Sequence, residues 1–147
     1  MFRGQFHHAI DAKGRISLPS RFRDLLVADA ERFILTPDPF DPCLQLFPLA
    51  AWEKLERRIA ELPSLDPNVV RFRRVYVSAA IECELDKAGR VLVPPHLRER
   101  GALERECVFA GMGPRIDLWS VERWTEATAM TPAQLADFRR ALAEVGL

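Results

Sequence analysis

Apolar and polar residues alternate along two short segments near the N-terminus. The alternation runs through residues 5–10 and again through residues 15–18. A period of two is typical of β-strands. Between them, Asp11-Ala-Lys-Gly14 is a turn sequence, because Asp bonds its own backbone and Gly accepts a positive φ. The pattern predicts a β-hairpin over residues 5–18.

The residues after this hairpin predict a short helix. Pro19 cannot donate to a β-ladder, and proline suits the first turn of a helix. Apolar residues at positions 22, 25 and 26 fit one helical face, so we expect a helix over Ser20–Val27.

The segment Asp11–Arg23 recurs 75 positions later as Asp86–Arg98. Asp, Gly, Arg, Pro and the last Arg occupy identical places in both segments. The apolar residues also match: Ile16 with Val91, Leu18 with Val93, and Phe22 with Leu97. The second copy therefore predicts a second hairpin and a helix over Pro95–Arg100 that Gly101 closes.

Four further strands are expected, at residues 33–36, 43–47, 107–110 and 116–119. Leu44-x-Leu-Phe47 matches Ile116-x-Leu-Trp119 at an offset of 72, and Trp52 matches Trp124 at the same offset. The repeat therefore extends well beyond the turn and its flanking strands.

Helical spacing of apolar residues predicts a helix over residues 52–62, ended by Pro63. Asp66-Pro67 caps a second helix whose apolar stripe reaches Tyr76, so the second strand set is expected from near Val77. The basic run at 71, 73 and 74 is expected on a solvated face, with a DNA or subunit contact as the alternative.

A last helix opens with Thr131 as N-cap and Pro132 in its first turn. Its apolar seam is formed by Leu135, Phe138, Leu142 and Val145. We expect this seam to pack on its own domain and keep a subunit contact open. Two heptad turns are too short to indicate a coiled coil.

The order strand, Asp-x-x-Gly-Arg turn, strand, Pro and short helix resembles the AbrB/SpoVT swapped-hairpin domain. Two copies opened by Met1-Phe-Arg-Gly4, each with an Asp-x-x-x-Arg motif, resemble the MraZ family of bacterial transcription regulators. The resemblance implies an α+β fold in which two tandem repeats interleave into one pseudo-dimeric β-barrel with peripheral helices. The expected boundaries are 5–48 for repeat 1, 49–76 for connecting helices, 77–120 for repeat 2 and 121–147 for C-terminal helices.

Charge is distributed unevenly along the 147 residues, although the formal net charge is zero. Residues 1–27 carry five basic and two acidic residues, a net +3, whereas residues 76–147 carry nine basic and eleven acidic residues, a net −2. The first repeat is therefore the better candidate for contacting a polyanion.

Three widely spaced cysteines, Cys43, Cys83 and Cys107, form no Cys-x-x-Cys motif. We interpret them as buried apolar thiols in a reducing compartment. No apolar run approaches the roughly 20 residues that span a bilayer, and no signal peptide is visible. We expect a cytoplasmic, nucleoid-associated protein with no membrane contact, no metal and no cofactor.

DNA binding is the first functional hypothesis. A two-stranded ribbon fits the major groove, and Arg15 follows the predicted turn, where a guanidinium can reach phosphate or a guanine edge. Lys13 and Arg3 are expected to contact phosphate, and Gly14 to allow close approach of the backbone. His7 and His8 lie on the same hairpin and are further candidate donors.

A structural role for the Asp-x-x-x-Arg pairs is the alternative. Asp11 and Arg15 can pair with each other, or with Asp86 and Arg90 across the barrel. For Asp11 we favour the structural role, because a carboxylate is a poor neighbour for phosphate. Glu82, Cys83 and Glu84 replace the histidine region in the second copy, so Arg90 is expected to be mostly structural.

The family resemblance also implies partners. It implies a homo-oligomeric ring of about eight subunits that binds short direct repeats in double-stranded promoter DNA. The promoter would be the protein's own, at the division and cell-wall gene cluster. A single turn binds weakly, and several turns on one ring gain by effective concentration.

Two other functional classes, an enzyme and a protein-interaction module, have weaker support in the sequence. Only His7, His8 and Asp11 support an enzymatic function. Adjacent residues on a strand face opposite sides, so the two histidines cannot readily bind one metal ion. No phosphate-binding loop or nucleophile elbow occurs, and we expect no enzyme. A protein-interaction module, either antitoxin-like or an oligomeric scaffold, is the alternative to the DNA hypothesis.

Overall fold

The computed structural model describes residues 1–27 and 32–147 and has the predicted α+β composition. Its strands are β1 Gln5–Ala9, β2 Arg15–Ser17, β3 Arg32–Pro37, β4 Leu44–Pro48, β5 Ile81–Glu84, β6 Arg90–Leu92, β7 Glu106–Gly111 and β8 Ile116–Ser120. Its helices are α1 Ser20–Val27, α2 Leu49–Ala60, α3 Pro67–Phe72, the π-helical turn η1 Arg73–Val77, α4 Pro95–Arg100, α5 Val121–Thr128 and α6 Pro132–Glu144. Each predicted helix and strand is present. The start of β5 differs, because the strand begins at Ile81 and not near Val77.

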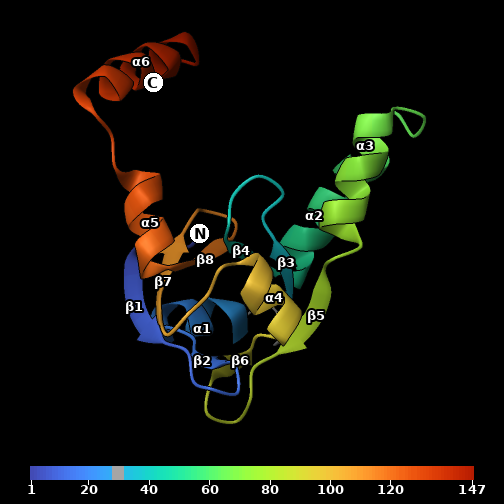
Figure 1. Ribbon diagram of the computed structural model, residues 1–147. Coiled ribbons are helices and arrows are strands. Elements are labelled where there is room, and N and C mark those ends of the chain that lie inside the picture. The colour runs from blue at the N-terminus through green and yellow to red at the C-terminus, as the bar shows by residue number, and fades with distance from the viewer. Residues whose placement is uncertain (28–31) are drawn as a thin grey trace.

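The strands form an open antiparallel sheet in the order β1-β7-β8-β4-β3-β5, and a separate two-stranded sheet of β2 and β6. The prediction of a closed barrel is wrong for the described part of the chain, because β1 and β5 remain edge strands. The chain leaves β1 and β5 through the two turns, and the three-residue strands that follow pair with each other (Figure 1). The sheet edges are thus not bridged.

The hairpin predicted over residues 5–18 and its second copy do not pair their own two arms. β1 pairs with β7, β2 with β6, and β5 with β3. Within the first turn, the Asp11 N–H donates to the Arg15 carbonyl at 2.9 Å, but the ladder stops there. Strands from residues 5–48 therefore pair with strands from residues 77–120.

The main core lies between the large sheet and the β2–β6 pair, with α1 and α4 closing its sides. The apolar positions that match between the repeats are all buried, as predicted: Ile16, Leu18, Phe22, Val91, Val93 and Leu97. The Phe22 ring meets Phe2 and Phe6 edge-on, with centroids 5.5 and 5.1 Å apart. Each such fully buried side chain contributes about 1.5–3 kcal/mol.

A second core packs α2 and η1 against β3 and β4, and its members are Ile34, Phe47, Trp52, Ile59 and Tyr76. The Tyr76 hydroxyl donates to Gln45 Oε1 at 2.6 Å, and its carbonyl accepts from Thr36 at 2.9 Å. These contacts keep the chain helical through Val77, so β5 begins at Ile81 rather than near Val77.

The C-terminal helix α6 stands away from the rest of the chain (Figure 1). Thr131 and Gln134 form a capping box, and Pro132 occupies the first turn, which confirms the predicted start. None of its residues is buried, and Phe138 is 46% exposed. The expectation that its seam packs on its own domain is therefore wrong for the single chain, since none of the residues described elsewhere in the chain buries it.

No helix in residues 1–27 or 32–147 combines the length and the apolar character that crossing a membrane requires.

Candidate nucleic-acid interface

Asp11 organises the first turn through three hydrogen bonds. Its Oδ1 accepts from the backbone N–H groups of Lys13 and Arg15, both at 2.9 Å. Its Oδ2 accepts from Arg15 Nε at 2.8 Å. Gly14 has φ +85°, the left-handed region that favours glycine. The turn therefore closes with Asp11 and Arg15 paired to each other, as the local form of the structural alternative predicts.

Asp86 organises the second turn in the same way. Its Oδ1 accepts from the N–H groups of Ala88 and Arg90 at 2.9 Å, and its Oδ2 accepts from Arg90 Nε at 2.8 Å. Gly89 has φ +74°. The pairing of one repeat's Asp with the other's Arg, which was the second form of the structural alternative, does not occur among the described residues.

Both carboxylates are anions at neutral pH. The backbone N–H of Arg15 lowers the pKa of Asp11, and the backbone N–H of Arg90 lowers the pKa of Asp86; the Arg side chains add to both effects. A charged Asp holds the Nε side of its arginine firmly and leaves the far side of the guanidinium untouched.

The terminal nitrogens of Arg15, Nη1 and Nη2, take part in no hydrogen bond within the described parts of the chain, and the side chain is 35% exposed. Two such nitrogens form a fork that matches a phosphate or a guanine edge. The structural role and a ligand-binding role are therefore compatible in one residue, because Asp11 uses only the Nε side.

The two turns lie side by side because β2 pairs with β6. Ile16 is opposite Val91 and both are buried, so Arg15 and Arg90 on the same ladder face outward. Reciprocal backbone bonds reinforce the pair: Val93 N–H donates to the Gly14 carbonyl at 2.8 Å, and Leu18 N–H donates to the Gly89 carbonyl at 3.0 Å.

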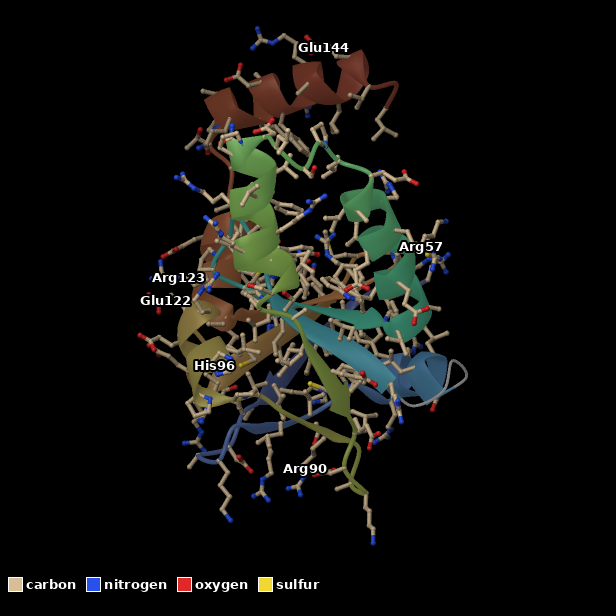
Figure 2. The ribbon with its side chains drawn as sticks, turned by 90° about the vertical axis from the view of Figure 1, so that its right-hand side faces the viewer. Arg57, Arg90, His96, Glu122, Arg123 and Glu144 are labelled. Carbon is tan, nitrogen blue, oxygen red and sulfur yellow. The ribbon has the colours of Figure 1, made fainter. Side chains whose placement is uncertain are left out.

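The outer surface of this pair carries the exposed Lys13 and Lys87 with the half-buried Arg15 and Arg90. Figure 2 shows Arg90 at the foot of the molecule, at the end opposite Glu144 on α6. We call these four residues the basic foot. The joining of the two turns into one surface could not be predicted, because local sequence patterns do not reveal which distant strands pair.

The other predicted residues lie apart from the basic foot. His7 is exposed on β1, whereas His8 is half-buried and meets the Phe109 ring edge-on at 5.8 Å. The prediction that the two face opposite sides is confirmed. The backbone of Arg3 lies against Gly111, at the other end of β1 from the turn. Eight positions separate Arg3 from Asp11, about 26 Å along an extended chain at roughly 3.3 Å per residue.

The acidic strand of the second repeat is partly neutralised. Arg32 on β3 pairs with Glu82 at 3.2 Å and with Glu84 at 3.5 Å. No local pattern in the sequence predicts this contact, which joins residues 50 positions apart. Because one arginine faces two exposed carboxylates, the surface at β5 keeps a net negative charge, whereas β1 contains no acidic residue.

The three cysteines are free, and Cys43 and Cys107 are buried. Burial raises the pKa of Cys83 and of Cys107 to about 11, and raises the pKa of Cys43 further. These thiols are therefore protonated at neutral pH. The interpretation as buried apolar thiols is confirmed for Cys43 and Cys107, whereas Cys83 is only half-buried. Within the described residues, no three His, Cys, Asp or Glu side chains are grouped to hold a metal ion.

A groove of about 860 Å³ lies between α2 and α3–η1. It combines an apolar floor that includes Ile59 and Val70 with charged side chains such as Glu56 and Arg57. Its lining contains no His or Cys, and its titratable acids are Glu53 and Glu56.

Comparison with known proteins identifies the chain's relatives. The family described as "MraZ protein, putative antitoxin-like" matches residues 1–75 and 77–143. The protein called transcriptional regulator MraZ in Heliobacterium modesticaldum is 44% identical over 126 residues, which cover 86% of this chain and 85% of that protein. The proteins of the same name in Pediococcus pentosaceus and Desulfitobacterium hafniense (strain Y51) are 37% and 39% identical over the full length of both chains. On this match along nearly its whole length, the chain belongs to the MraZ family.

Proposed function

We propose that the protein is a DNA-binding transcriptional regulator that contacts short direct repeats in its own promoter, at the division and cell-wall gene cluster. The names of its relatives support the general role of a transcriptional regulator. The proposed role is not enzymatic, and it places the protein in the cytoplasm, on the nucleoid.

The observation that carries the proposal is the state of Arg15. Asp11 orients the guanidinium through Nε, and the Nη1–Nη2 fork remains available next to the exposed Lys13. A guanidinium held in one direction loses little entropy when it pairs with a planar acceptor. The ribbon of β2 and β6 presents this fork, Lys13 contacts phosphate, and Gly14 allows the DNA close to the backbone.

We propose that the first turn reads the DNA and that Arg90 is mostly structural. The local geometry of the two turns is alike, so the distinction rests on charge. Residues 1–27 carry +3, and β1 presents His7 where β5 presents Glu82. His8 is a weaker candidate because Phe109 covers part of it. Arg3, at the other end of β1, would contact a different stretch of DNA.

We further propose that copies of the chain assemble into a homo-oligomeric ring of about eight subunits. The uncovered seam of α6 supports a contact between subunits, because a 13-residue helix is marginal in water without a partner. A ring carrying several basic feet would engage repeated sites in phase and gain by effective concentration.

The test measures binding of the full chain to the duplex immediately upstream of its own gene, beside a scrambled duplex, over a salt series. The variants are Arg15→Ala and, as a matched control, Arg58→Ala on the exposed side of α2. We expect the native chain and Arg58→Ala to prefer the upstream duplex, with affinity falling as salt rises. Arg15→Ala should lose the preference.

The pattern of loss identifies the contact. A base contact by Arg15 costs roughly 1–3 kcal/mol on the upstream duplex only, whereas a phosphate contact weakens both duplexes and lowers the salt slope by about one. Normal binding by a folded Arg15→Ala would place the contacts elsewhere. No preference by the native chain at any salt would overturn the proposal and favour a protein-interaction module, for which a stoichiometric foreign protein should co-purify.

A further inference from the structure

The first turn rests on an arginine from the other repeat. Arg98, on α4, places its guanidinium against Gly14: a Cβ added to that glycine would lie 3.0 Å from both Nε and Cζ of Arg98. Arg98 Nη1 also donates to the Ala12 carbonyl at 3.5 Å. The first turn is thus supported on its inner side by a residue 84 positions away in the sequence. Glycine is needed at position 14 because of the limited space as well as the positive φ.

The second turn has the reciprocal support. Arg23, on α1, lies against Gly89, and a Cβ there would meet the Nη1 of Arg23 and lie 3.1 Å from its Cζ. Arg23 and Arg98 occupy the same place in their repeats, 75 positions apart. Each repeat therefore supplies the arginine that supports the turn of the other.

Packing, rather than hydrogen bonding, holds the inner part of Arg98. Its Nε is buried and has no hydrogen-bond partner among the described residues. A buried donor without a partner is costly, and the packing of the flat guanidinium against Gly14 offsets this cost. Lysine has no such plane and cannot fill that space in the same way.

We propose that Arg98 is a positioning residue for DNA binding: it fixes the Ala12–Arg15 backbone and thereby the direction in which Arg15 presents its Nη fork. Arg23 does the same for the second turn. The expected effect on DNA affinity rests on the proposed function. The expected effect on the rigidity of the turn rests on geometry alone. Arg98 gives the second repeat a part in reading DNA even if its own turn makes no contact.

The test uses the full-length variants Arg98→Met and Arg98→Lys, with Arg23→Met as the matched control. Amide hydrogen exchange follows the Gly14, Arg15 and Val93 N–H groups at the first turn, and the Gly89, Arg90 and Leu18 N–H groups at the second. We expect faster exchange at the first turn only in both Arg98 variants, and at the second turn only in Arg23→Met. Equal acceleration at both turns, or none, would overturn the inference.

The same variants are then titrated with the upstream duplex over a salt series. We expect both Arg98 variants to bind roughly tenfold more weakly with an unchanged salt slope, and Arg23→Met to stay within about twofold of the native chain. Recovery of native affinity by Arg98→Lys, with a lower slope in Arg98→Met, would show a direct charge contact and overturn positioning. If the native chain prefers no duplex, the proposed function fails, while the exchange pattern still decides whether Arg98 supports the turn.

Discussion

The first and second turns have the same hydrogen bonds but lie beside different strands. Asp11–Arg15 and Asp86–Arg90 repeat each other bond for bond, with equal Nε to Oδ2 distances of 2.8 Å. The preceding strands differ: β1 reads Gln-Phe-His-His-Ala and β5 reads Ile-Glu-Cys-Glu. The repeated motif therefore builds the turn, and the surrounding charge decides which turn suits a polyanion.

The comparison also shows why a structural and a binding role were hard to separate. A salt bridge repeated at identical offset is what a symmetric structural pair gives. The structure adds that this pair occupies one side of each guanidinium, so Asp11 prepares Arg15 for a ligand instead of competing with it. Equivalent substitutions in the two turns can therefore separate the contribution of turn geometry to stability and DNA binding from the contribution of charge.

The largest expected effect comes from removing the glycines. In Gly14→Ala, the new Cβ would lie 2.5 Å from the Val93 carbonyl oxygen, at φ +85°. We expect a loss of about 2–4 kcal/mol in the free energy of unfolding, measured by urea denaturation, from backbone strain and the clash. Gly89→Ala should lose less, because at φ +74° the new Cβ would meet the flexible side chain of Arg23 rather than a backbone atom.

Gly146→Ala is the matched control, because its φ is +88° with nothing within 4 Å of the new Cβ. We expect little change there, since the end of the chain can relax. A loss at Gly14 no larger than at Gly146 would contradict the close packing of the first turn.

Much of the fold follows from local pattern, and the site follows only in part. Alternation and helix caps predicted the elements, and the 75-residue repeat predicted the matched buried residues such as Ile16 and Val91. The pairing of β2 with β6 could not be predicted from local pattern, because more than 70 residues separate the two strands and the alternation within a strand does not indicate its partner. The basic foot and the Arg98–Gly14 contact depend on that pairing.

A smaller effect is expected in acid. The pKa of Asp11 and the pKa of Asp86 are lowered in the folded state, so their stabilisation is complete above the unfolded value of about 4 and is lost as pH falls through the folded pKa. Urea midpoints measured from pH 6 downward should fall less steeply in Asp11→Asn and in Asp86→Asn than in the native chain, and by equal amounts.

Unequal acid responses of these two variants would contradict the equivalence of the turns. Asp117 serves as the control with the opposite sign, because burial raises its pKa in the folded chain. Protonation of Asp117 favours the folded state as pH falls. The urea midpoint of Asp117→Asn should therefore fall more steeply with decreasing pH than that of the native chain, whereas the midpoints of the two turn variants should fall less steeply.

The smallest effect is expected from making β5 resemble β1. His7 corresponds to Glu82 and Ala9 to Glu84 at the 75-residue offset, so the double change Glu82→His, Glu84→Ala removes the charge that distinguishes the strands. The exposed pairs with Arg32 are lost, which should change the free energy of unfolding by less than about 0.5 kcal/mol. Affinity for the upstream duplex should rise about two- to threefold at low salt, because Arg32 becomes available and two anions leave the flank of the basic foot.

The matched control for that change is Glu122→His, Glu126→Ala on α5, which removes the same charge and disrupts the Arg123–Glu126 pair. If both double variants raise affinity equally, net charge alone accounts for the effect and the two strands do not distinguish the turns. A rise confined to the β5 variant, measured in the same salt series, would mean that Glu82 and Glu84 are what keep the second turn from binding. The identical geometry of Arg15 and Arg90 would then be specialised by their neighbours alone.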